Sequence, residues 1–298
     1  MPVDFSETSL NALETAISIA KQQRAKITLL NVVDSTFMFG FKGVYYISEK
    51  TIESIVDVSA RMLNPVLKKL KEEHQLDAAS EIKVGLVPQC IVKAAADHDV
   101  DLIIMGTHGA SGVRRLFIGS IAQKVIKISS CPVLTVPSNQ TWVNFEKILF
   151  PIRPIKGAIE KYDFLKRLIG DTSASLDILI LASSFDEEKK LLKSLVKELK
   201  TKAEKDKIKI SGSLKTGKKM SHEVLKVSKS IEADMIVVTS DISSDFKQFL
   251  IGPFEQHIVN HATMPVLSVK AKLTNPDSQV VIQQIHESLP SQIPAFFN

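Results

Sequence analysis

Short apolar runs alternate along the chain with longer stretches in which apolar residues recur at the period of a helix. The apolar runs of the first half are AKITLLNVV, SEIKVGLV, VDLIIMG and CPVLTVP, and the helical stretches include SLNALETAISIAKQQ and SARMLNPVLKKLKEEHQ. Strands that are apolar on both faces and alternate with amphipathic helices are typical of a parallel sheet with helices on both faces. The first helix is expected to follow Ser6, an N-cap residue, with Glu7 in its first turn.

The same order of elements repeats in the second half. KILFPIRP, SLDILILAS, KIKISGSL, ADMIVVTS and MPVLSVK predict its strands, and at a constant spacing Asp101 falls on Asp234 and Gly119 on Gly252. The fold class is therefore α/β, a tandem duplication of a five-stranded unit. We assign unit one to residues 1–138 and unit two to residues 145–271, joined by the polar linker SNQTWVN, with residues 272–298 as a tail.

Unit one lacks most of its first strand. Unit two begins with KILFPI, whereas unit one begins with MPVD, so only the end of the matching strand is present. That strand is central in a sheet of this kind, and strands usually run for about 5–6 residues. Either the start codon is placed too late or unit one works with a stub, and the sequence leaves both alternatives open.

Composition narrows the class of protein. The 298 residues are 44% hydrophobic, which is enough for one large core or two ordinary ones, and the length favours two. The net charge of +5 comes from lysines spread along helical stretches, and aromatic residues are only 6%, which argues against a nucleic-acid partner. Neither a signal peptide nor an apolar run of the ~20 residues that a membrane helix needs is visible. Cys90 and Cys131 fit no metal pattern, so we expect a soluble cytoplasmic protein with two incidental thiols.

The stretch GTHGASGVRRLFIGS, residues 106–120, carries the candidate chemistry. It follows an apolar strand and precedes a predicted helix, and its glycines allow close approach of the backbone to a ligand. N–H groups in the loop and at the start of the helix attract anions. The stretch is neither a P-loop nor a GxGxxG motif. From the residue pattern alone, a phosphate cradle and a plain turn both remain open.

The stretches MPVDFSETSLNAL, ITLLNVVD and IIMGTHGASGVRRLFIGSIAQKVIKISSCPVLTVP together resemble the universal stress protein family, in its ATP-binding, UspA-like form. The Gly-x2-Gly-x9-Gly-Ser signature is present in full, and the resemblance covers nearly all of residues 1–137. The positions that match the family's binding residues are Pro2, Asp4, Val32, Met105, Gly106, His108, Gly109, Gly119, Ser120 and Ile121.

The resemblance implies a five-stranded parallel sheet of order 3-2-1-4-5 in each unit. It implies ATP or another adenine nucleotide as the ligand, with Mg²⁺ held by the phosphates. Asp4 and Val32 would face the adenine and ribose, whereas the glycines, His108 and Ser120 would face the phosphates. It also implies pairing through the last strands, Pro132–Val136 of unit one with Pro265–Val269 of unit two, and a further homodimer of chains.

Unit two resembles the family in layout but not in chemistry. Thr239, Ile242 and Pro253 stand where Gly106, Gly109 and Ser120 stand in unit one, and Arg153 takes the place of Asp4. A β-branched residue disfavours positive φ, and proline has no N–H to donate. We therefore predict that unit two is degenerate and binds no ATP.

No local spacing assembles a catalytic triad, a Cys–His pair or paired carboxylates, so no catalytic residue is assigned and the chain is not expected to be an enzyme. Arg114 and Arg115 are interpreted as solvated, and Asp97, Asp99 and Asp101 as solvated or capping residues without a metal. The main hypothesis is a nucleotide-dependent switch of the stress response. The alternatives are a scaffold that binds no nucleotide and a slow ATPase.

Overall fold

The computed structural model describes residues 1–35, 48–107, 119–138, 144–155, 158–170, 172–182, 186–217, 219–240 and 253–270. In unit one the elements are α1 (Glu7–Gln23), β1 (Ile27–Asp34), α2 (Glu49–Glu72), β2 (Ala78–Gly85), α3 (Val87–Asp97), β3 (Ile103–Gly106), α4 (Ser120–Ile128) and β4 (Val133–Val136). In unit two they are β5 (Lys147–Ile152), α5 (Lys161–Ile169), β6 (Ser175–Ala182), α6 (Asp186–Lys205), β7 (Lys209–Thr216), α7 (Met220–Ser230), β8 (Met235–Ser240), α8 (Pro253–His261) and β9 (Val266–Lys270).

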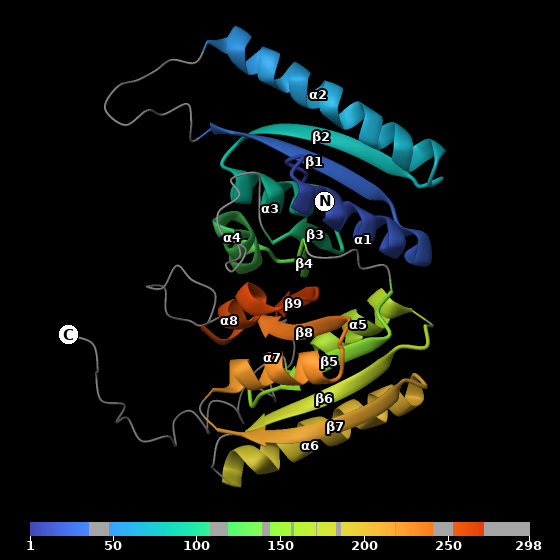
Figure 1. Ribbon diagram of the computed structural model, residues 1–298, viewed down its shortest axis with the longest axis vertical. Coiled ribbons are helices and arrows are strands. Elements are labelled where there is room, and N and C mark those ends of the chain that lie inside the picture. Colours follow the sequence, from blue (N-terminus) through green and yellow to red (C-terminus); the bar gives the residue numbers. More distant parts are fainter. Residues whose placement is uncertain are drawn as a thin grey trace, which may run out of the picture.

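The strands form a seven-stranded sheet of order β3-β4-β9-β8-β5-β6-β7 and a two-stranded sheet of β1 and β2. Unit two therefore has the expected order 3-2-1-4-5, as β7-β6-β5-β8-β9, and all its strand pairs are parallel. Figure 1 shows the two units one above the other, with α2 at one end of the molecule and α6 at the other. The α/β fold class is confirmed.

Unit one departs from this order at its first strand. The chain start contributes one bridge, between Pro2 and Leu30, where unit two has the six-residue strand β5. Hydrogen bonds from the Val3 N–H to the Leu30 carbonyl and from the Leu30 N–H to the Met1 carbonyl, both 2.8 Å long, hold this stub against β1. Because the stub is so short, no ladder between described residues joins β1 to β3, and the sheet of unit one is divided in two.

The helix α1 begins as the sequence predicts. The Ser6 hydroxyl accepts a hydrogen bond from the Ser9 N–H at 3.2 Å, which satisfies one of the N–H groups that the first turn leaves unpaired. Glu7 lies in that first turn, where its charge is favourable. The apolar face of α1, which includes Ala12, Leu13, Ala16, Ile17 and Ala20, is buried in the core.

The last strands of the two units, β4 and β9, lie side by side as the second and third strands of the large sheet, next to its β3 edge (Figure 1). They pair antiparallel, with Leu134 opposite Leu267, and neither side chain is exposed to solvent. The Thr135 hydroxyl of β4 donates a hydrogen bond to the Val266 carbonyl of β9. The Lys270 ammonium of unit two donates to the Lys127 carbonyl of unit one at 2.6 Å. Each of β4 and β9 has a neighbour on both sides, so neither is an open edge.

Several sequence interpretations lie outside the described residues. They concern Arg114 and Arg115, the linker residues 139–143, and the tail 272–298. The domain limits at residues 138, 145 and 271 stay predictions.

Candidate functional site

The predicted binding residues come from four stretches of unit one that meet at the carboxyl edge of its strands. The structure describes Pro2, Asp4, Val32, Met105, Gly106, Gly119, Ser120 and Ile121, whereas His108 and Gly109 lie outside the described residues. Met105 and Gly106 end β3, Val32 lies near the end of β1, and Ser120 and Ile121 form the first turn of α4. The carboxyl edge of a parallel sheet is where open α/β folds bind ligands.

The end of β3 and the start of α4 are tied together. The Gly119 N–H donates to the Thr107 carbonyl at 2.6 Å, and the Thr107 N–H donates to the Val136 carbonyl at 3.1 Å. Residues 107 and 119 therefore meet although eleven residues separate them in the chain. This closure directs the amino end of α4 towards the edge of the sheet.

The first turn of α4 differs from that of α1. Gly119 is its N-cap residue, and no side chain among the described residues caps it. Its first turn contains no acidic residue. The first N–H groups of a helix have no partner within the helix and carry the positive end of its dipole. The amino end of α4 therefore suits an anionic group such as a phosphate.

Asp4 is held at the entrance to α1. Its Oδ1 accepts a hydrogen bond from the Ser6 N–H at 3.0 Å and one from the Ser6 hydroxyl at 2.6 Å. The intervening Phe5 has a positive φ of 61°, which turns the chain between the stub and the helix. The exposed Asp4 carboxylate is thus held at the entrance to α1, directly after the short strand segment that pairs with β1.

Two of the predicted binding residues, Met105 and Ile121, mainly pack in the hydrophobic core. The Met105 side chain is 6% exposed and belongs to the core, and Ile121 packs partly buried against it. Gly106 is required by the packing of α1, because a Cβ on it would stand 2.6 Å from Thr8 Cγ2 and 3.0 Å from the Thr8 backbone. The first glycine of the signature thus brings α1 and β3 into direct contact.

The sequence analysis missed three residues that position parts of the site. Thr8 packs against Gly106, and Thr107 accepts from the Gly119 N–H. Asn31 is the third. Asn31 is buried, and its amide nitrogen donates to the Val3 carbonyl at 2.7 Å, which fixes the stub that carries Pro2 and Asp4. A polar Asn within the apolar run ITLLNVVD is the one signal in the sequence that pointed to such a role.

In unit two the described side chains at the corresponding place contact one another. The Arg153 guanidinium lies 4.0 Å from the centre of the Phe254 ring, and Phe254 corresponds to Ile121. The buried Glu255 accepts a hydrogen bond from the Ser240 hydroxyl at 2.9 Å. The helix α8 begins at Pro253, which has no N–H to offer. Thr239 is buried in β8, and Ile242 and Gly252 lie outside the described residues.

Lys161, near Arg153 and Glu255, is a buried lysine. The Lys161 ammonium donates to the carbonyls of Pro151 and Val237, at 2.5 and 3.0 Å, and lies 4.3 Å from the centre of the Phe150 ring. Burial lowers the pKa of Lys161 well below its usual value, the nearby Arg153 lowers it further, and Glu255 opposes both. Lys161, Arg153 and Glu255 of unit two thus interact with one another, which favours a structural role for this unit.

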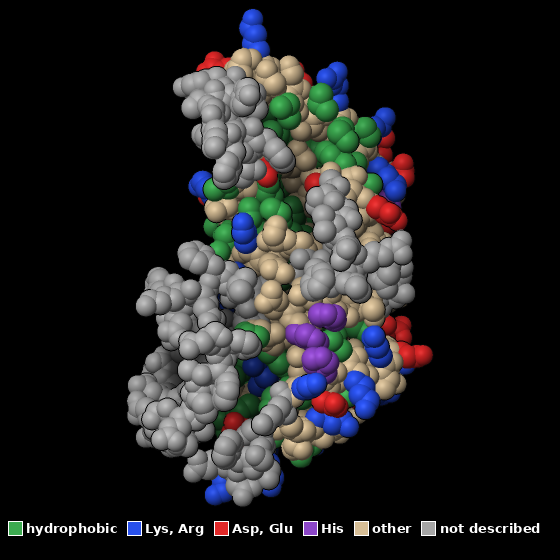
Figure 2. Space-filling view, turned by 60° about the vertical axis from the view of Figure 1, so that its left-hand side comes forward, with side chains coloured by type: hydrophobic (Ala, Val, Ile, Leu, Met, Phe, Trp, Pro, Cys, Tyr) green, Lys and Arg blue, Asp and Glu red, His purple; other side chains and the backbone are tan. Residues whose placement is uncertain are grey.

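Three histidines stack on the surface of unit two, where Figure 2 shows them as a purple group. The ring of His257 on α8 lies 4.2 Å from that of His222 on α7 and 4.3 Å from that of His261. Burial lowers the pKa of His257, and the charges of His261 and His222 lower it further. Within the described part of the chain, no group of three or more His, Cys, Asp or Glu residues is arranged to hold a metal ion.

The surroundings of the two cysteines disfavour the thiolate form. Cys90 and Cys131 are unpaired with each other, and burial raises the pKa of each thiol above its usual value. A raised pKa lowers the thiolate fraction, which is the nucleophilic form. Among the residues that the structure describes, no helix is both long and apolar enough to span a bilayer.

The model of the universal stress protein family matches residues 1–137 and 169–270 of this chain. A universal stress protein of Methanocaldococcus jannaschii is 35% identical over 136 residues, which make up 46% of this chain and 79% of that protein. The universal stress protein YxiE of Bacillus subtilis is 30% identical over 139 residues, 45% of this chain and 94% of its own.

Among solved structures, a universal stress protein of Archaeoglobus fulgidus matches both units. It is 20% identical to this chain, with a TM-score of 0.74, and the match covers 91% of this chain and 97% of that one. At this identity the likeness concerns the fold. It shows that the tandem arrangement of two units is similar to one already observed.

Proposed function

The chain belongs to the universal stress protein family, whose model matches well over half of it, and on this premise we propose that unit one binds an adenine nucleotide such as ATP. The observation that carries the proposal is the hydrogen bond from Gly119 to Thr107, which directs the amino end of α4 to the carboxyl edge of the sheet. Phosphates bind at such helix ends because N–H groups and the helix dipole both favour negative charge.

The residues of unit one fit such a ligand. Gly119 has no side chain to obstruct a phosphate, and Ser120 adds a hydroxyl donor beside the N–H groups of the first turn. Asp4 follows the short strand segment at the chain start and Val32 lies in β1, and the family resemblance assigns both residues to the adenine and ribose. Mg²⁺, when bound, would be held by the phosphates and would neutralise part of their charge.

We propose that nucleotide occupancy acts as a switch and not as a step of catalysis. The partner controlled by the switch is a second protein or a second copy of this chain. A homodimer would use a surface other than β4 and β9, because these strands already pair with each other. The cytoplasmic location also stays a prediction.

The test is to release and identify the ligand of the protein purified without added nucleotide. Heat denaturation followed by chromatography and mass spectrometry is expected to give about one adenine nucleotide per chain. The double variant Gly109→Ile, Ser120→Pro gives unit one the residues that unit two has at these two positions. This variant should release no nucleotide, because it loses a donor N–H and a glycine that could adopt positive φ.

A matched control is Glu49→Pro, which places proline at the first residue of the exposed start of α2. Proline is tolerated at the first helical position, so both proteins should fold. Undiminished ATP affinity in the double variant contradicts the proposal and favours the scaffold. Turnover of ATP that disappears in the double variant but persists in the control would identify the slow ATPase.

A further inference from the structure

The helix α4 connects two edges of unit one. Its first residue, Ser120, lies at the edge where we propose that phosphate binds. Because α4 links the parallel strands β3 and β4, it runs back from the carboxyl end of β3 to the amino end of β4. Its nine residues span about 13 Å, so its last turn lies well away from the proposed phosphate site.

The pairing of the two units brings unit two to that last turn. β4 and β9 pair antiparallel, so the amino end of β4 lies beside the carboxyl end of β9. Lys270 is the last residue of β9, and its ammonium donates a hydrogen bond to the Lys127 carbonyl of α4 at 2.6 Å. The last carbonyl groups of a helix have no partner within the helix and carry the negative end of its dipole. A lysine of unit two therefore caps a helix of unit one.

Lys270 is held between groups from both units. The residue is partly buried, and burial lowers the pKa of its ammonium. The Glu255 carboxylate of unit two opposes this effect and favours the charged form. Glu255 is itself buried, accepts from the Ser240 hydroxyl and interacts with the buried Lys161. The cap on α4 is thus linked electrostatically to the buried charges of unit two.

The sequence does not provide the reciprocal contact. At the spacing that places Gly119 on Gly252, Lys270 of unit two stands where unit one has Pro137. The proline side chain has no donor, and the Pro137 carbonyl accepts from the Asn11 amide at 2.8 Å. This lysine cap therefore serves the helix that follows the complete glycine signature, and not its counterpart α8.

The two ends of α4 suit charges of opposite sign. A cation at the carboxyl end and an anion at the amino end both interact favourably with the same helix dipole. A helix of nine residues is too short to be stable by itself, so a group that anchors one end also helps to order the other. The Gln123 N–H closes the first turn by donating to the Gly119 carbonyl at 3.2 Å, and this bond reports on that order.

We propose that Lys270 is the residue by which unit two regulates nucleotide binding in unit one. Its ammonium anchors the carboxyl end of α4 and thereby keeps the first turn ordered for phosphate. By thermodynamic linkage, a nucleotide bound at the first turn strengthens the contact between Lys270 and Lys127 by the same factor. This inference rests on the proposed function and adds to it a regulatory role for unit two.

The test measures the ATP affinity of the full chain by calorimetry with Mg²⁺ present. Lys270→Met keeps the length of the side chain but removes the ammonium. We expect this variant to bind ATP about five-fold more weakly, because a favourable charge at a partly buried helix end is lost. Lys270→Arg retains a cation that donates to carbonyl groups, so it should keep most of the affinity.

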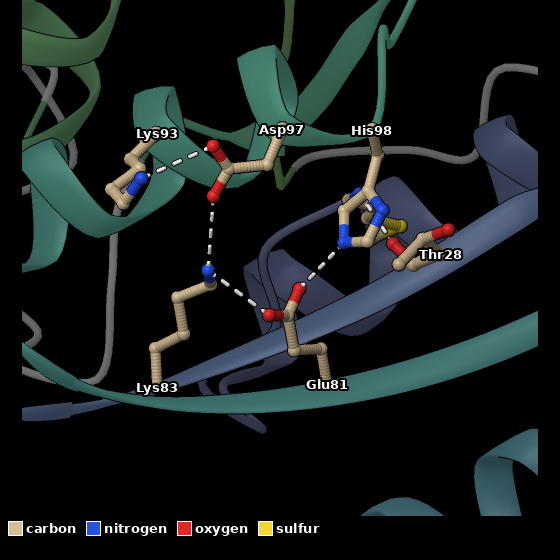
Figure 3. A network of polar contacts seen from close by, with 7 residues as sticks. Thr28, Glu81, Lys83, Lys93, Asp97 and His98 are labelled. Carbon is tan, nitrogen blue, oxygen red and sulfur yellow. Dashed lines mark hydrogen bonds and ion pairs between the residues drawn. The ribbon is translucent and has the colours of Figure 1, made fainter.

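Two controls separate this effect from a general loss of stability or charge. Thr135→Val removes the hydrogen bond from the Thr135 hydroxyl to the Val266 carbonyl, so it weakens the contact between the units without changing the cap on α4. Lys93→Met removes a lysine from α3, the helix that packs against α4. Lys93 pairs with Asp97 in the network shown in Figure 3, where its side chain is 71% exposed. Both controls should bind ATP as the wild type does, because exposed ion pairs contribute little.

Two further measurements test the contact itself. Without nucleotide, hydrogen exchange at the Gln123 amide should be faster in Lys270→Met than in the wild type. In the wild type, saturating ATP should slow the acetylation of the Lys270 amine by acetic anhydride, as measured by mass spectrometry. Acetylation of the exposed Lys93 should not change.

The outcomes separate this inference from the proposed function. If the wild type binds no ATP, the proposed function is overturned and the regulation falls with it. If the wild type binds ATP and Lys270→Met binds it equally well, only the regulation is overturned. A loss of affinity that Thr135→Val or Lys93→Met reproduces also overturns it, because stability or net charge is then the cause. Equal exchange at Gln123 in both proteins would show that Lys270 does not order α4.

Discussion

Gly106, the last residue of β3, packs against Thr8 of α1 so closely that a Cβ added to Gly106 would lie 2.6 Å from Thr8 Cγ2. The same added atom would lie 3.0 Å from the carbonyl carbon and oxygen of Thr8. This contact fixes the distance between the first helix and the strand that leads to the glycine-rich loop. It gives the first glycine of the signature a packing role that is separate from any ligand.

Gly106→Ala should therefore destabilise unit one. Overpacking of a close contact costs about 1–3 kcal/mol, because backbone atoms have to move. Urea denaturation followed by circular dichroism measures the loss. Adding Thr8→Ala removes the Cγ2 contact and should recover part of the stability. If Gly106→Ala has the wild-type midpoint, the close approach of α1 and β3 is not maintained in solution.

Asn31→Ala should loosen the stub that carries Asp4. The change removes the hydrogen bond to the Val3 carbonyl and leaves that acceptor without its partner, at a cost of about 1–3 kcal/mol. Because Asp4 follows Val3, ATP affinity measured by calorimetry should also fall. A suitable comparison is Ser211→Ala, which removes an exposed hydrogen bond to Asp177 in unit two and should leave ATP affinity unchanged. Equal ATP affinity in all three proteins would show that the stub does not position the site.

The antiparallel pairing of β4 with β9 predicts that the effects of truncating Leu134 and Leu267 on the free energy of unfolding depend on each other. Each faces the other across β4 and β9, and each is fully buried, so replacing either with alanine should cost about 2–5 kcal/mol. The double variant should lose less than the sum, because the second truncation enlarges a cavity that already exists. The measurement is the urea midpoint of the wild type, the two single variants and the double variant, which together form a double-mutant cycle. Strict additivity would mean that the two side chains do not pack together.

The stacked histidines predict a loss of stability in mild acid. Burial lowers the pKa of His257, and the charges of His261 and His222 lower it further, from an ordinary value of 6.5. Below that value the unfolded chain takes up a proton that the folded chain resists, so the free energy of unfolding falls as the pH decreases from about 6.5 through the lowered folded-state pKa.

His257→Gln should flatten this dependence. The measurement is the urea midpoint of the wild type and the variant at several pH values between 7.5 and 5.5, chosen around the ordinary histidine pKa of about 6.5. Other titrating groups act equally in both proteins, so the difference between the two curves isolates the stack. Parallel curves would show that the folded His257 accepts a proton as readily as the unfolded one.

Much of the fold was accessible from the sequence, because its signals are local. The alternation of apolar runs and helix-period stretches predicted the α/β class, and Ser6 marked the start of α1 through a hydrogen bond to Ser9. The repeat predicted that unit two would follow unit one in layout. Pro253 and Arg153 also indicate a second unit without a phosphate cradle, since proline lacks a donor whatever its surroundings, and this stays a prediction.

Other features depend on residues that are distant in the sequence. The contact of Gly106 with Thr8, the bond from Asn31 to Val3 and the closure of Thr107 on Gly119 each require the chain to be folded before the partners meet. The sequence showed that the first strand was short, but not that the strands of unit one divide there between two sheets. Periodicity and composition determined which elements form, whereas close packing between elements decided which backbone and side-chain groups face one another, because that depends on three-dimensional distances.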